Sequence, residues 1–489
     1  LPDWLQVDEL PPILCTDGFA LHEQQVTQLL SIMSSTPLKE PHPLISAVGK
    51  AATAESLTPF VEKLITIWGR HVSVEQEHRW LLSPLYWWHT EGLATQVFPI
   101  IMGKLWRPRI YADGEVKWFP HLLAVWEQIA TDEILRLLGR LQRQKRLLVS
   151  YEVIQKAIDR CMVKRRLDRS QLHDAMIPIF GLDERSERRF IYGQDEVVLA
   201  IDEDIRPILR WENRLYHRLP QELRETRKLS VQEIVSAWDR IERELPKIVE
   251  NELWRLDRAL VYERRWKKEE FEQLFLRHPV MRHIGRSIIW GRYMFNGQLT
   301  HSFVLTEDGV PLSADYDEVE LPSYGYYGLI HPIDLTPEKR IEWHEMLTDY
   351  EIVTIFDQLF RPVYTLTAEE KNSPILTRFD HQFDQEMLFT LRSLHWKPLD
   401  GLHTWRRFFP YSNVSALLTL QTVTQPDGSK IERFEGCRFA QGKVKLDGLP
   451  PVNHVVNLPV RWLLPRRVRP RILSEVLWDW ARAVDTGAS

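Results

Sequence analysis

Hydrophobic residues in the first third of the chain recur with the period of an amphipathic helix. Short breaks that carry Pro, Gly or Ser separate the periodic runs. The pattern predicts helices over residues 21–33, 43–54, 57–69, 75–90, 95–106, 121–146 and 150–164. Because no strand pattern lies between them, we expect helix pairs stacked in series, which form an irregular HEAT-like repeat region over residues 1–181.

The pattern changes to alternation between Arg188 and Arg218, which predicts a small sheet with a turn at residues 211–214. We assign residues 182–228 to this β-rich linker segment. The sequence Ser-Val-Gln-Glu at 230–233 has the form of a capping box and predicts the start of a long helix. Pro246 lies inside that helix and should bend or divide it.

Residues 229–489 mix both patterns and predict an α+β domain, so the fold class of the whole chain is α+β. Turns are predicted at Asn296-Gly297 and Asp308-Gly309, and a hairpin at 426–428. Helices are predicted to begin at Thr336-Pro337 and at Ser474, and a further helix over 379–394. Four large aromatic side chains are expected to share one core of this domain: Trp290, Phe303, Trp343 and Phe356.

Several segments also resemble a known bacterial family. They include FIYGQDEV at 190–197, ELWRLDRALVYERRW at 252–266, FLRHPVMRHIGRSIIWG at 275–291 and the run from GLIHPIDL to LFRPVY at 328–364. The chain thus resembles the domain of unknown function 4132, which occurs in MolR-like (molybdate metabolism regulator-like) proteins, most specifically over the core 252–364. The opening LPDWL and the late LSEVLWDW are similar to flanking segments of that family. The resemblance implies no reaction, so it supplies no catalytic residues.

Composition excludes several classes of protein. Lys and Arg number 63 against 68 Asp and Glu, and the net charge of −5 gives no global attraction to nucleic acid or anionic membranes. Cys15, Cys161 and Cys437 lie far apart, so we expect neither a disulfide framework nor a Cys-rich metal site, and a cytoplasmic location is favoured. No apolar run approaches the length of a membrane span. The chain opens on Leu1 rather than Met, which is consistent with a piece of a longer polypeptide.

Polar residues that could form an active site crowd the stretch 278–364. A zinc-protease helix needs two His one turn apart around a Glu, but His344-Glu345 is followed by Thr348 where the second His would stand. We therefore expect no metal and no cofactor. The His-Pro pairs at 278–279 and 331–332 are expected to act in turns, with the imidazole bonded to local backbone. If 285–364 holds an enzyme site, the candidate catalytic residues are His331, Asp334, Arg361, His344 and Glu345.

Two groups of arginines could bind nucleic acid or an acidic partner. One lies on a predicted helix face and comprises Arg136, Arg140 and Arg143. The other is a C-terminal cluster that comprises Arg461, Arg466, Arg467, Arg469 and Arg471. The alternative for both is a solvated surface without a ligand.

These observations favour a non-enzymatic interaction or regulatory protein that binds a protein partner. No Gly-x-Ser-x-Gly nucleophile turn and no Gly-rich phosphate loop occurs in the chain. Two alternatives stay open. One is an enzyme with an unrecognised site in 285–364, and the other is a nucleic-acid-binding protein that uses the basic helix and the Arg-rich C-terminal segment.

Overall fold

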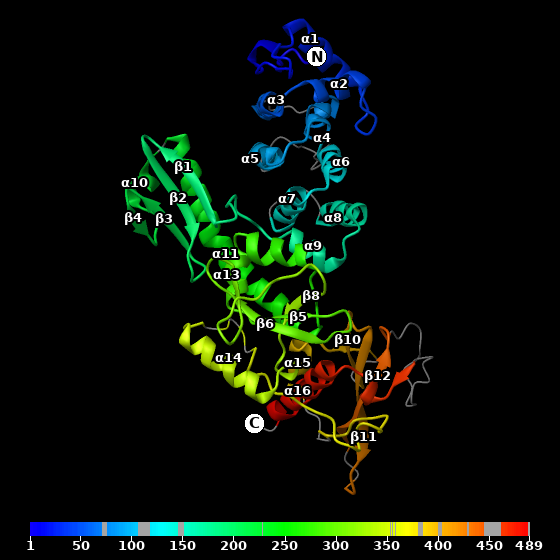
Figure 1. The fold of residues 1–489 in the computed structure, drawn as a ribbon. Coiled ribbons are helices and arrows are strands. Elements are labelled where there is room, and N and C mark those ends of the chain that lie inside the picture. Colours follow the sequence, from blue (N-terminus) through cyan, green and yellow to red (C-terminus); the bar gives the residue numbers. More distant parts are fainter. Residues whose placement is uncertain are drawn as a thin grey trace. The chain divides into compact units, whose positions relative to one another are not determined.

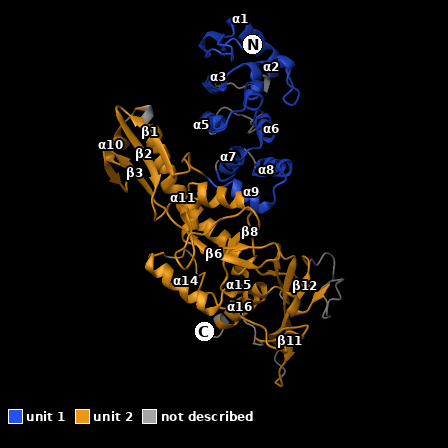
Figure 2. Cartoon of the chain, in the orientation of Figure 1, with its two compact units in different colours: residues 1–178 blue, residues 179–489 orange. Residues whose placement is uncertain are grey.

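The computed structural model describes residues 1–70, 76–105, 118–144, 151–226, 228–352, 354, 356, 358–379, 385–399, 403–427, 430–444 and 461–487. The chain divides into two compact units, Leu1–Pro178 and Ile179–Ser489 (Figure 2). The three-part division drawn from the sequence, with cuts after residues 181 and 228, stays a prediction. Within the described ranges, no helix combines the length and the apolar composition needed to cross a bilayer.

The first unit is helical, as the periodicity predicts (Figure 1). Its elements are η1 (Val7–Glu9), α1 (Glu23–Ser35), α2 (Pro43–Ala51), α3 (Ala54–Arg70), η2 (Gln76–Leu82), α4 (Pro84–Trp87), α5 (Leu93–Leu105), α6 (Phe119–Ile129), α7 (Asp132–Gln142), α8 (Tyr151–Arg165) and α9 (Arg169–Ala175). Helix α3 packs on α5, α5 packs on α7, and α6 and α7 both pack on α8. One hydrophobic core runs through the unit from Leu5 to Leu172. The assignment to HEAT-like repeats stays a prediction.

The single helix predicted over 121–146 is wrong, because the chain forms two helices there. Ala130 adopts a left-handed conformation with φ of 52° and ends α6. Thr131 is the N-cap of α7, and its hydroxyl oxygen accepts a hydrogen bond from the backbone N–H of Ile134. Thr131 and Asp132 therefore start a new helix, although the apolar periodicity continues across them. Residues 145 and 146 of the predicted helix lie outside the described residues.

The second unit begins with the small sheet that alternation predicts between Arg188 and Arg218. Its strands β1 (Glu187–Tyr192), β2 (Asp195–Ile201), β3 (Pro207–Trp211) and β4 (Arg214–Tyr216) pair antiparallel in that order. Glu212 and Asn213 have φ of 50° and 60° and form the turn predicted at 211–214.

Helices α10 (Gln221–Glu225) and α11 (Leu229–Val261) follow this sheet. The predicted capping box is wrong: α11 begins at Leu229 with Lys228 as N-cap, so Ser230 lies in the first turn rather than before it. Pro246 does not divide α11, which continues through it with Trp238, Leu245 and Ile248 buried on either side.

A central sheet of four antiparallel strands has the order β7-β6-β5-β8. The strands are β5 (Trp290–Tyr293), β6 (Leu299–Leu305), β7 (Pro311–Leu312) and β8 (Tyr326–Leu329), and the helical segments around them are α12 (Lys268–Phe271), η4 (Glu272–Arg277), α13 (Met281–Arg286), η5 (Pro332–Asp334) and α14 (Pro337–Asp349). The predicted turns are confirmed, because Gly297 and Gly309 both have positive φ. Thr336 caps α14 as predicted, and its Oγ1 accepts from the Lys339 N–H at 3.3 Å.

The predicted single aromatic core is wrong, because the two faces of the central sheet have separate cores. Trp290 and Phe303 are cross-strand neighbours and pack on aromatic rings of α12 and η4. Trp343 of α14 is fully buried and donates its indole N–H to Ser302 at 2.9 Å. Ser302 is next to Phe303 in β6, so it points to the opposite face. Phe356 is only half-buried.

The last sheet has the order β13-β12-β11-β10-β9 and is covered by two helices (Figure 1). Its strands are β9 (Lys397–Pro398), β10 (Thr404–Phe409), β11 (Val414–Thr424), β12 (Lys430–Gln441) and β13 (Trp462–Leu463), with α15 (Gln385–Ser393), η6 (Pro465–Arg467) and α16 (Pro470–Gly487). Strands β11 and β12 pair as the predicted hairpin requires, with Thr424 opposite Lys430, and residue 428 of the predicted turn lies outside the described residues. The last helix starts at Pro470 rather than Ser474, since proline is well tolerated in the first turn.

Of the helix predicted over 379–394, the structure describes α15, and residues 380–384 lie outside the described residues. All described strand pairs are antiparallel. The α+β class is therefore confirmed.

Candidate functional site

The C-terminal helix α16 carries three charged side chains on its buried face. Arg471, Glu475 and Asp479 are spaced about one turn apart, and each is only 2% exposed. Charged side chains are almost never buried so completely unless they are paired. Each of the three therefore has to find a partner on another element of the second unit.

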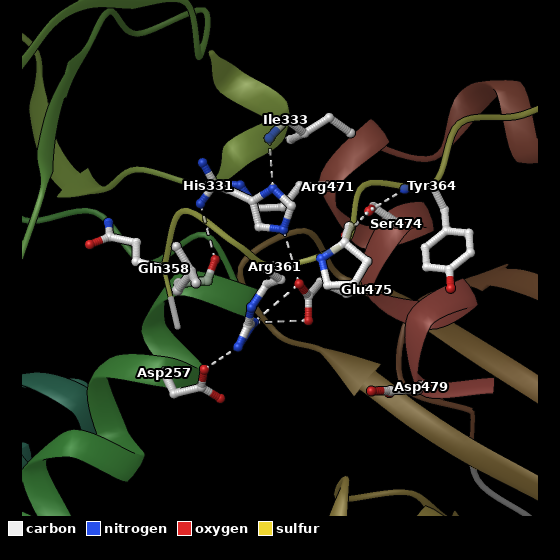
Figure 3. Close-up of polar contacts among 12 residues, drawn as sticks. Asp257, His331, Ile333, Gln358, Arg361, Tyr364, Arg471, Ser474, Glu475 and Asp479 are labelled. Carbon is white, nitrogen blue, oxygen red and sulfur yellow. Dashed lines mark hydrogen bonds and ion pairs between the residues drawn. The ribbon is translucent and has the colours of Figure 1, made fainter. Parts of the chain in front are cut away.

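Glu475 meets two of the candidate catalytic residues (Figure 3). Its Oε1 accepts from His331 Nε2 at 2.9 Å, and its two oxygens accept from Arg361 Nη1 at 3.1 and 3.2 Å. The second guanidinium nitrogen, Nη2, is paired with Asp257 of α11. The Arg361 guanidinium also lies over the Trp478 ring, 4.7 Å from its centroid. Arg361 is thus bonded on two sides and stacked on a third.

The protonation states follow from these contacts. His331 Nδ1 accepts from the Ile333 N–H at 3.1 Å, so its proton is on Nε2 and is donated to Glu475. Burial lowers the pKa of His331 more than the Glu475 hydrogen bond raises it. Burial alone would raise the pKa of Glu475, but the His331 hydrogen bond and the Arg361 charge outweigh it and lower that pKa. A neutral imidazole therefore bonds an ionised carboxylate.

Asp334, the third candidate, is joined to the same helix through Arg471. Its Oδ2 accepts from the Tyr293 hydroxyl at 2.8 Å and from the His331 backbone N–H at 3.2 Å, and it is paired with Arg471. Arg471 also donates to the Leu260 carbonyl at 3.0 Å. Burial opposes ionisation of Asp334, but the Arg471 charge and these hydrogen bonds lower its pKa.

Asp479 completes the set. It is paired with Arg407 of β10 and accepts from the Trp396 indole N–H at 2.8 Å. Arg407 is 4% exposed. Burial raises the pKa of Asp479 to about 6 despite the Arg407 charge, so the aspartate is mostly ionised at neutral pH. We call these residues the α16 ionic cluster: Asp257, Tyr293, His331, Asp334, Arg361, Trp396, Arg407, Arg471, Glu475 and Asp479.

Most polar atoms of the α16 ionic cluster are already bonded. Both Glu475 oxygens accept hydrogen bonds from other members, and the two His331 nitrogens are bonded to Glu475 and to the Ile333 N–H. Neither of the two cavities described below is lined by His331, Asp334 or Arg361. A general acid or base must reach the proton that it transfers. The geometry instead suits a structural role, in which buried ion pairs hold α16 against α11, β10 and the segment after β8.

The remaining catalytic candidates lie elsewhere. His344 and Glu345 are exposed on α14, and the His344 ring is in edge contact with Phe360 at 5.4 Å between centroids. The structure thus brings together three of the five candidates, through a helix that the sequence did not connect with them. Across the part of the chain that the structure describes, no three His, Cys, Asp or Glu side chains are arranged to hold a metal ion.

The helix arginines of the first unit are only partly available to a ligand. Arg136 is half-buried near Asp132 and Glu133, and burial lowers its pKa against the effect of those acids. Arg140 lies over the Phe98 ring at 4.7 Å. Arg143 is exposed.

In the C-terminal cluster, Arg466 and Arg467 are exposed on η6. Arg466 donates to the Asn372 side chain at 2.7 Å, and Arg469 is paired with Glu263. Arg471 is the exception: its inclusion in a basic surface is wrong, since it is buried against Asp334.

The His-Pro pairs act in turns, as predicted. His278 Nδ1 accepts from the backbone N–H groups of Val280 and Met281 at 3.2 and 3.3 Å, and His331 makes the equivalent bond to Ile333. His42-Pro43, which the sequence reading passed over, uses the same device: His42 Nδ1 accepts from the Leu44 N–H at 3.2 Å.

A cavity of about 740 Å³ in the second unit contains a serine–histidine contact. His283 lines it and lies 2.9 Å from the Ser186 hydroxyl. That hydroxyl donates its proton to the Pro279 carbonyl at 2.8 Å, so the histidine must donate to the serine. Burial and the nearby charges of Arg286 and Arg282 lower the pKa of His283 to about 3. In a serine nucleophile with its general base, the serine hydroxyl donates to the histidine, so the direction of the hydrogen bond here is the reverse.

Sequence reasoning missed Asp257, Arg407, Arg471, Glu475 and Asp479 as partners of the candidate residues. A signal was present in RILSEVLWDW at 471–480, where charged residues recur one turn apart inside a strongly apolar run. Such charges on the buried stripe of a helix indicate buried partners. Which partners they are depends on contacts between residues that are far apart in the chain.

Comparison with known proteins places part of this chain beside an uncharacterised family. Residues 214–396 match the family model described as Domain of unknown function (DUF4132). Uncharacterized protein YehI from Escherichia coli (strain K12) is 30% identical over 219 residues, which cover 44% of this chain and 18% of YehI. The chain thus spans less than a fifth of the relative that it matches. No solved structure matches it.

The matched residues contain the core 252–364 on which the resemblance was most specific. They include Asp257, His331, Asp334 and Arg361 of the α16 ionic cluster. The partners on β10 and α16 lie beyond the match. The similarity of LPDWL and LSEVLWDW to family segments stays a prediction.

Proposed function

We propose that this chain is a non-enzymatic, MolR-like regulatory protein of the bacterial cytoplasm, in which a HEAT-like helical unit accompanies an α+β unit that docks a protein partner. The observation that carries the proposal is an exposed apolar face on α14. Ile341 is 59% exposed and Phe360 is 66% exposed. His344 lies one turn from Ile341 and packs its ring edge against Phe360.

Two tyrosines form a separate exposed aromatic pair at the C-terminal end of α14. The rings of Tyr316 and Tyr350 stack at 5.7 Å between centroids, and both are about half exposed. The Tyr316 hydroxyl is bonded to Asp349, two turns along α14 from Ile341. We call the other three exposed side chains the α14 face: Ile341, His344 and Phe360.

The charges around the α14 face indicate the chemistry of the partner. Acidic residues on or beside α14 comprise Glu338, Glu342, Glu345, Asp349 and Glu351. Two cations also lie on α14: Lys339 is already paired with Asp315 at 3.2 Å and with Glu342 at 2.5 Å, and Arg340 is half-buried next to Ile341. A partner surface with apolar anchors inside a basic rim would complement this face. Burial of each large apolar side chain would contribute about 1.5–3 kcal/mol.

The alternative of an enzyme in 285–364 has weaker support. His331, Asp334 and Arg361 are bonded inside the buried α16 ionic cluster, whereas His344 belongs to the α14 face and Glu345 is exposed on the same helix. Exposed side chains without a cavity are better suited to contact a protein than to enclose a substrate.

The test compares two matched double variants of the full chain. Ile341→Asp/Phe360→Ser changes the α14 face, and Ile191→Asp/Phe389→Ser makes the same changes at positions that are 68% and 70% exposed on β1 and α15. Proteins that co-purify from the source bacterium are quantified for each, and a candidate partner is then purified and titrated. We expect the α14 variant to weaken the purified partner's affinity at least about tenfold, with the control unchanged.

Two results would contradict the proposal. One is a set of co-purified proteins that is identical for both variants and the native chain. The other is a purified partner that binds the α14 variant with the same affinity as the native chain. Equal melting temperatures of the native chain and both variants are required, because a loss of folding would mimic a loss of binding.

A further inference from the structure

The first unit contains a cavity of about 550 Å³ whose described lining holds a cation and no carboxylate. Its polar walls come from the end of α1, from η2 and from α6, and they comprise Ser34, Ser35, Thr36, Arg79, Ser83 and His121. Cavities of this size accept small-molecule ligands. The composition of the walls is unusual, because the other cavity mixes four arginines with six acids.

Arg79 gives the cavity its charge. Among the described residues it makes no ion pair, and its side chain is exposed. A guanidinium in a recess presents several N–H donors in a planar fork that fits the oxygens of a phosphate or carboxylate.

His121 faces the same space from α6. Its Nε2 lies 3.0 Å from the hydroxyl of Ser83, which is itself 1% exposed. Burial, and then the charge of Arg79, lower the pKa of His121 to about 4, so the ring is neutral at physiological pH. An anion placed between the two side chains would offset the Arg79 charge and attract a proton to the ring, which favours the imidazolium.

The elements around α6 supply the other groups that bear on His121. Helix η2 provides Arg79, and Ser83 precedes α4. From α8, Arg160 and Lys164 bond to Glu127 and to the Glu127 and Gln128 carbonyls, near the opposite end of α6. Arg79 is therefore the charged group that lowers the pKa of His121.

The hydroxyls at the end of α1 already donate to backbone. Ser34 donates to the Ser31 carbonyl at 2.7 Å, Ser35 donates to the Ile32 carbonyl at 3.1 Å, and Thr36 donates to the same carbonyl at 2.6 Å. These bonds go to the Ser31 and Ile32 carbonyls near the end of α1, so the wall that α1 forms is polar without bringing a net charge.

We propose that this cavity binds a small organic anion, with Arg79 holding its phosphate or carboxylate group and His121 taking up a proton as it binds. The apolar part of the lining, from Leu38 and Trp80, then contacts the body of the ligand. This site is independent of the α14 face, and its failure would leave the proposed function unaffected.

Calorimetric titration of the full chain tests the site with phenyl phosphate, benzoate and benzenesulfonate, at about pH 7.5 and about pH 5.5. Benzenesulfonate keeps its charge across this range, so any pH dependence of its binding belongs to the protein. If bound anion returns His121 to an ordinary pKa, its affinity should rise about tenfold at the lower pH. The stronger of phenyl phosphate and benzoate identifies the anionic group that the site prefers.

Three single variants separate the contributions. Arg79→Gln should weaken all three anions at least about tenfold. His121→Gln should abolish the pH dependence and the proton uptake seen in buffers of different ionisation enthalpy. Arg169→Gln removes the same charge from an exposed position on α9 and should change nothing.

The site is refuted if none of the three anions binds, or if neutral benzyl alcohol binds as well as they do. It is also refuted if Arg79→Gln has no effect, or if the pH dependence survives in His121→Gln. Because Arg79 is exposed and His121 is only half-buried, both variants should fold, which their melting temperatures verify.

Discussion

Glu475 in the last helix accepts hydrogen bonds from Arg361 with both of its carboxylate oxygens, across 114 positions of the chain. Both side chains are buried, at 2% and 7% exposure. A buried pair of this kind contributes little net stability compared with apolar residues, but breaking it leaves one uncompensated charge in the interior. The second unit therefore needs α16 in place to neutralise the buried charge of Arg361.

Removal of this carboxylate should be strongly destabilising. Glu475→Gln leaves the Arg361 guanidinium with Asp257 as its remaining acidic partner, and we expect a loss of about 3–5 kcal/mol in unfolding free energy. Urea unfolding of the full chain, followed by tryptophan fluorescence, measures this loss. Glu342→Gln, which breaks the exposed pair with Lys339, is the matched control and should cost less than about 1 kcal/mol.

The double variant Glu475→Leu/Arg361→Leu sharpens the same test. Because both buried charges disappear together, it should be more stable than Glu475→Gln alone. A double variant that is less stable than the single one would show that Arg361 has stabilising partners beyond Glu475, with Asp257 and the Trp478 ring as the candidates.

Local signals in the sequence predicted local structure well. The positive φ of Gly297 and Gly309, the Thr336 cap and the His331 turn each depend on residues within a few positions of one another. The prediction of a single helix over 121–146 is wrong because apolar periodicity continues across the Thr-Asp pair that starts α7. Each of these outcomes has its cause within one turn of chain.

The α16 ionic cluster could not be assembled from the sequence for a physical reason. His331 and Glu475 are 144 positions apart, and Arg471 and Asp334 are 137 apart. The residues Pro-Arg-Arg-Val-Arg-Pro-Arg do not by themselves distinguish the exposed Arg467 from the enclosed Arg471. The apolar run after Arg471 indicates that it is buried, but only the packing of α16 decides which residue it meets.

Trp343 should be essential to the face of the central sheet that α14 covers. Its ring is fully buried, and its indole N–H bonds to Ser302, so Trp343→Ala removes a large apolar volume and one hydrogen bond. We expect a loss of about 3–5 kcal/mol. Phe389→Ala, at a position 70% exposed on α15, should stay within about 0.5 kcal/mol. An unchanged melting temperature for Trp343→Ala would contradict this packing.

Acid should destabilise the protein through His283 before most carboxylates titrate. Burial lowers the pKa of His283 to about 3, so below its ordinary pKa the unfolded chain binds a proton that the folded chain does not. Stability attributable to this group is present at neutral pH and is lost as the pH falls through the window between 6.5 and 3. Between pH 7 and pH 5 the loss should be about 2 kcal/mol.

The comparison between variants isolates this effect, because Asp479 acts in the opposite direction. Its raised pKa of about 6 means that the folded state gains a proton first as the pH falls. Unfolding free energies of the native chain and His283→Gln are therefore measured at both pH values, and the native chain should lose more. His217→Gln, at an exposed position, should behave as the native chain does. Equal pH dependence in all three proteins would exclude the assignment to His283.

The last prediction concerns nucleic acid, for which the exposed arginines give a clean test. Arg136 is half-buried beside acids and Arg471 is enclosed, so substituting them would perturb folding rather than a surface. Arg143→Glu/Arg466→Glu/Arg467→Glu changes exposed side chains only. We expect weak binding of duplex or single-stranded oligonucleotides at low salt and none at physiological ionic strength, because 68 acidic residues oppose 63 basic ones. A phosphate-binding face would instead give a log–log salt slope of about −0.9 per phosphate neutralised on duplex DNA. Submicromolar affinity that persists at physiological salt and is abolished by the triple variant would place nucleic-acid binding above protein docking.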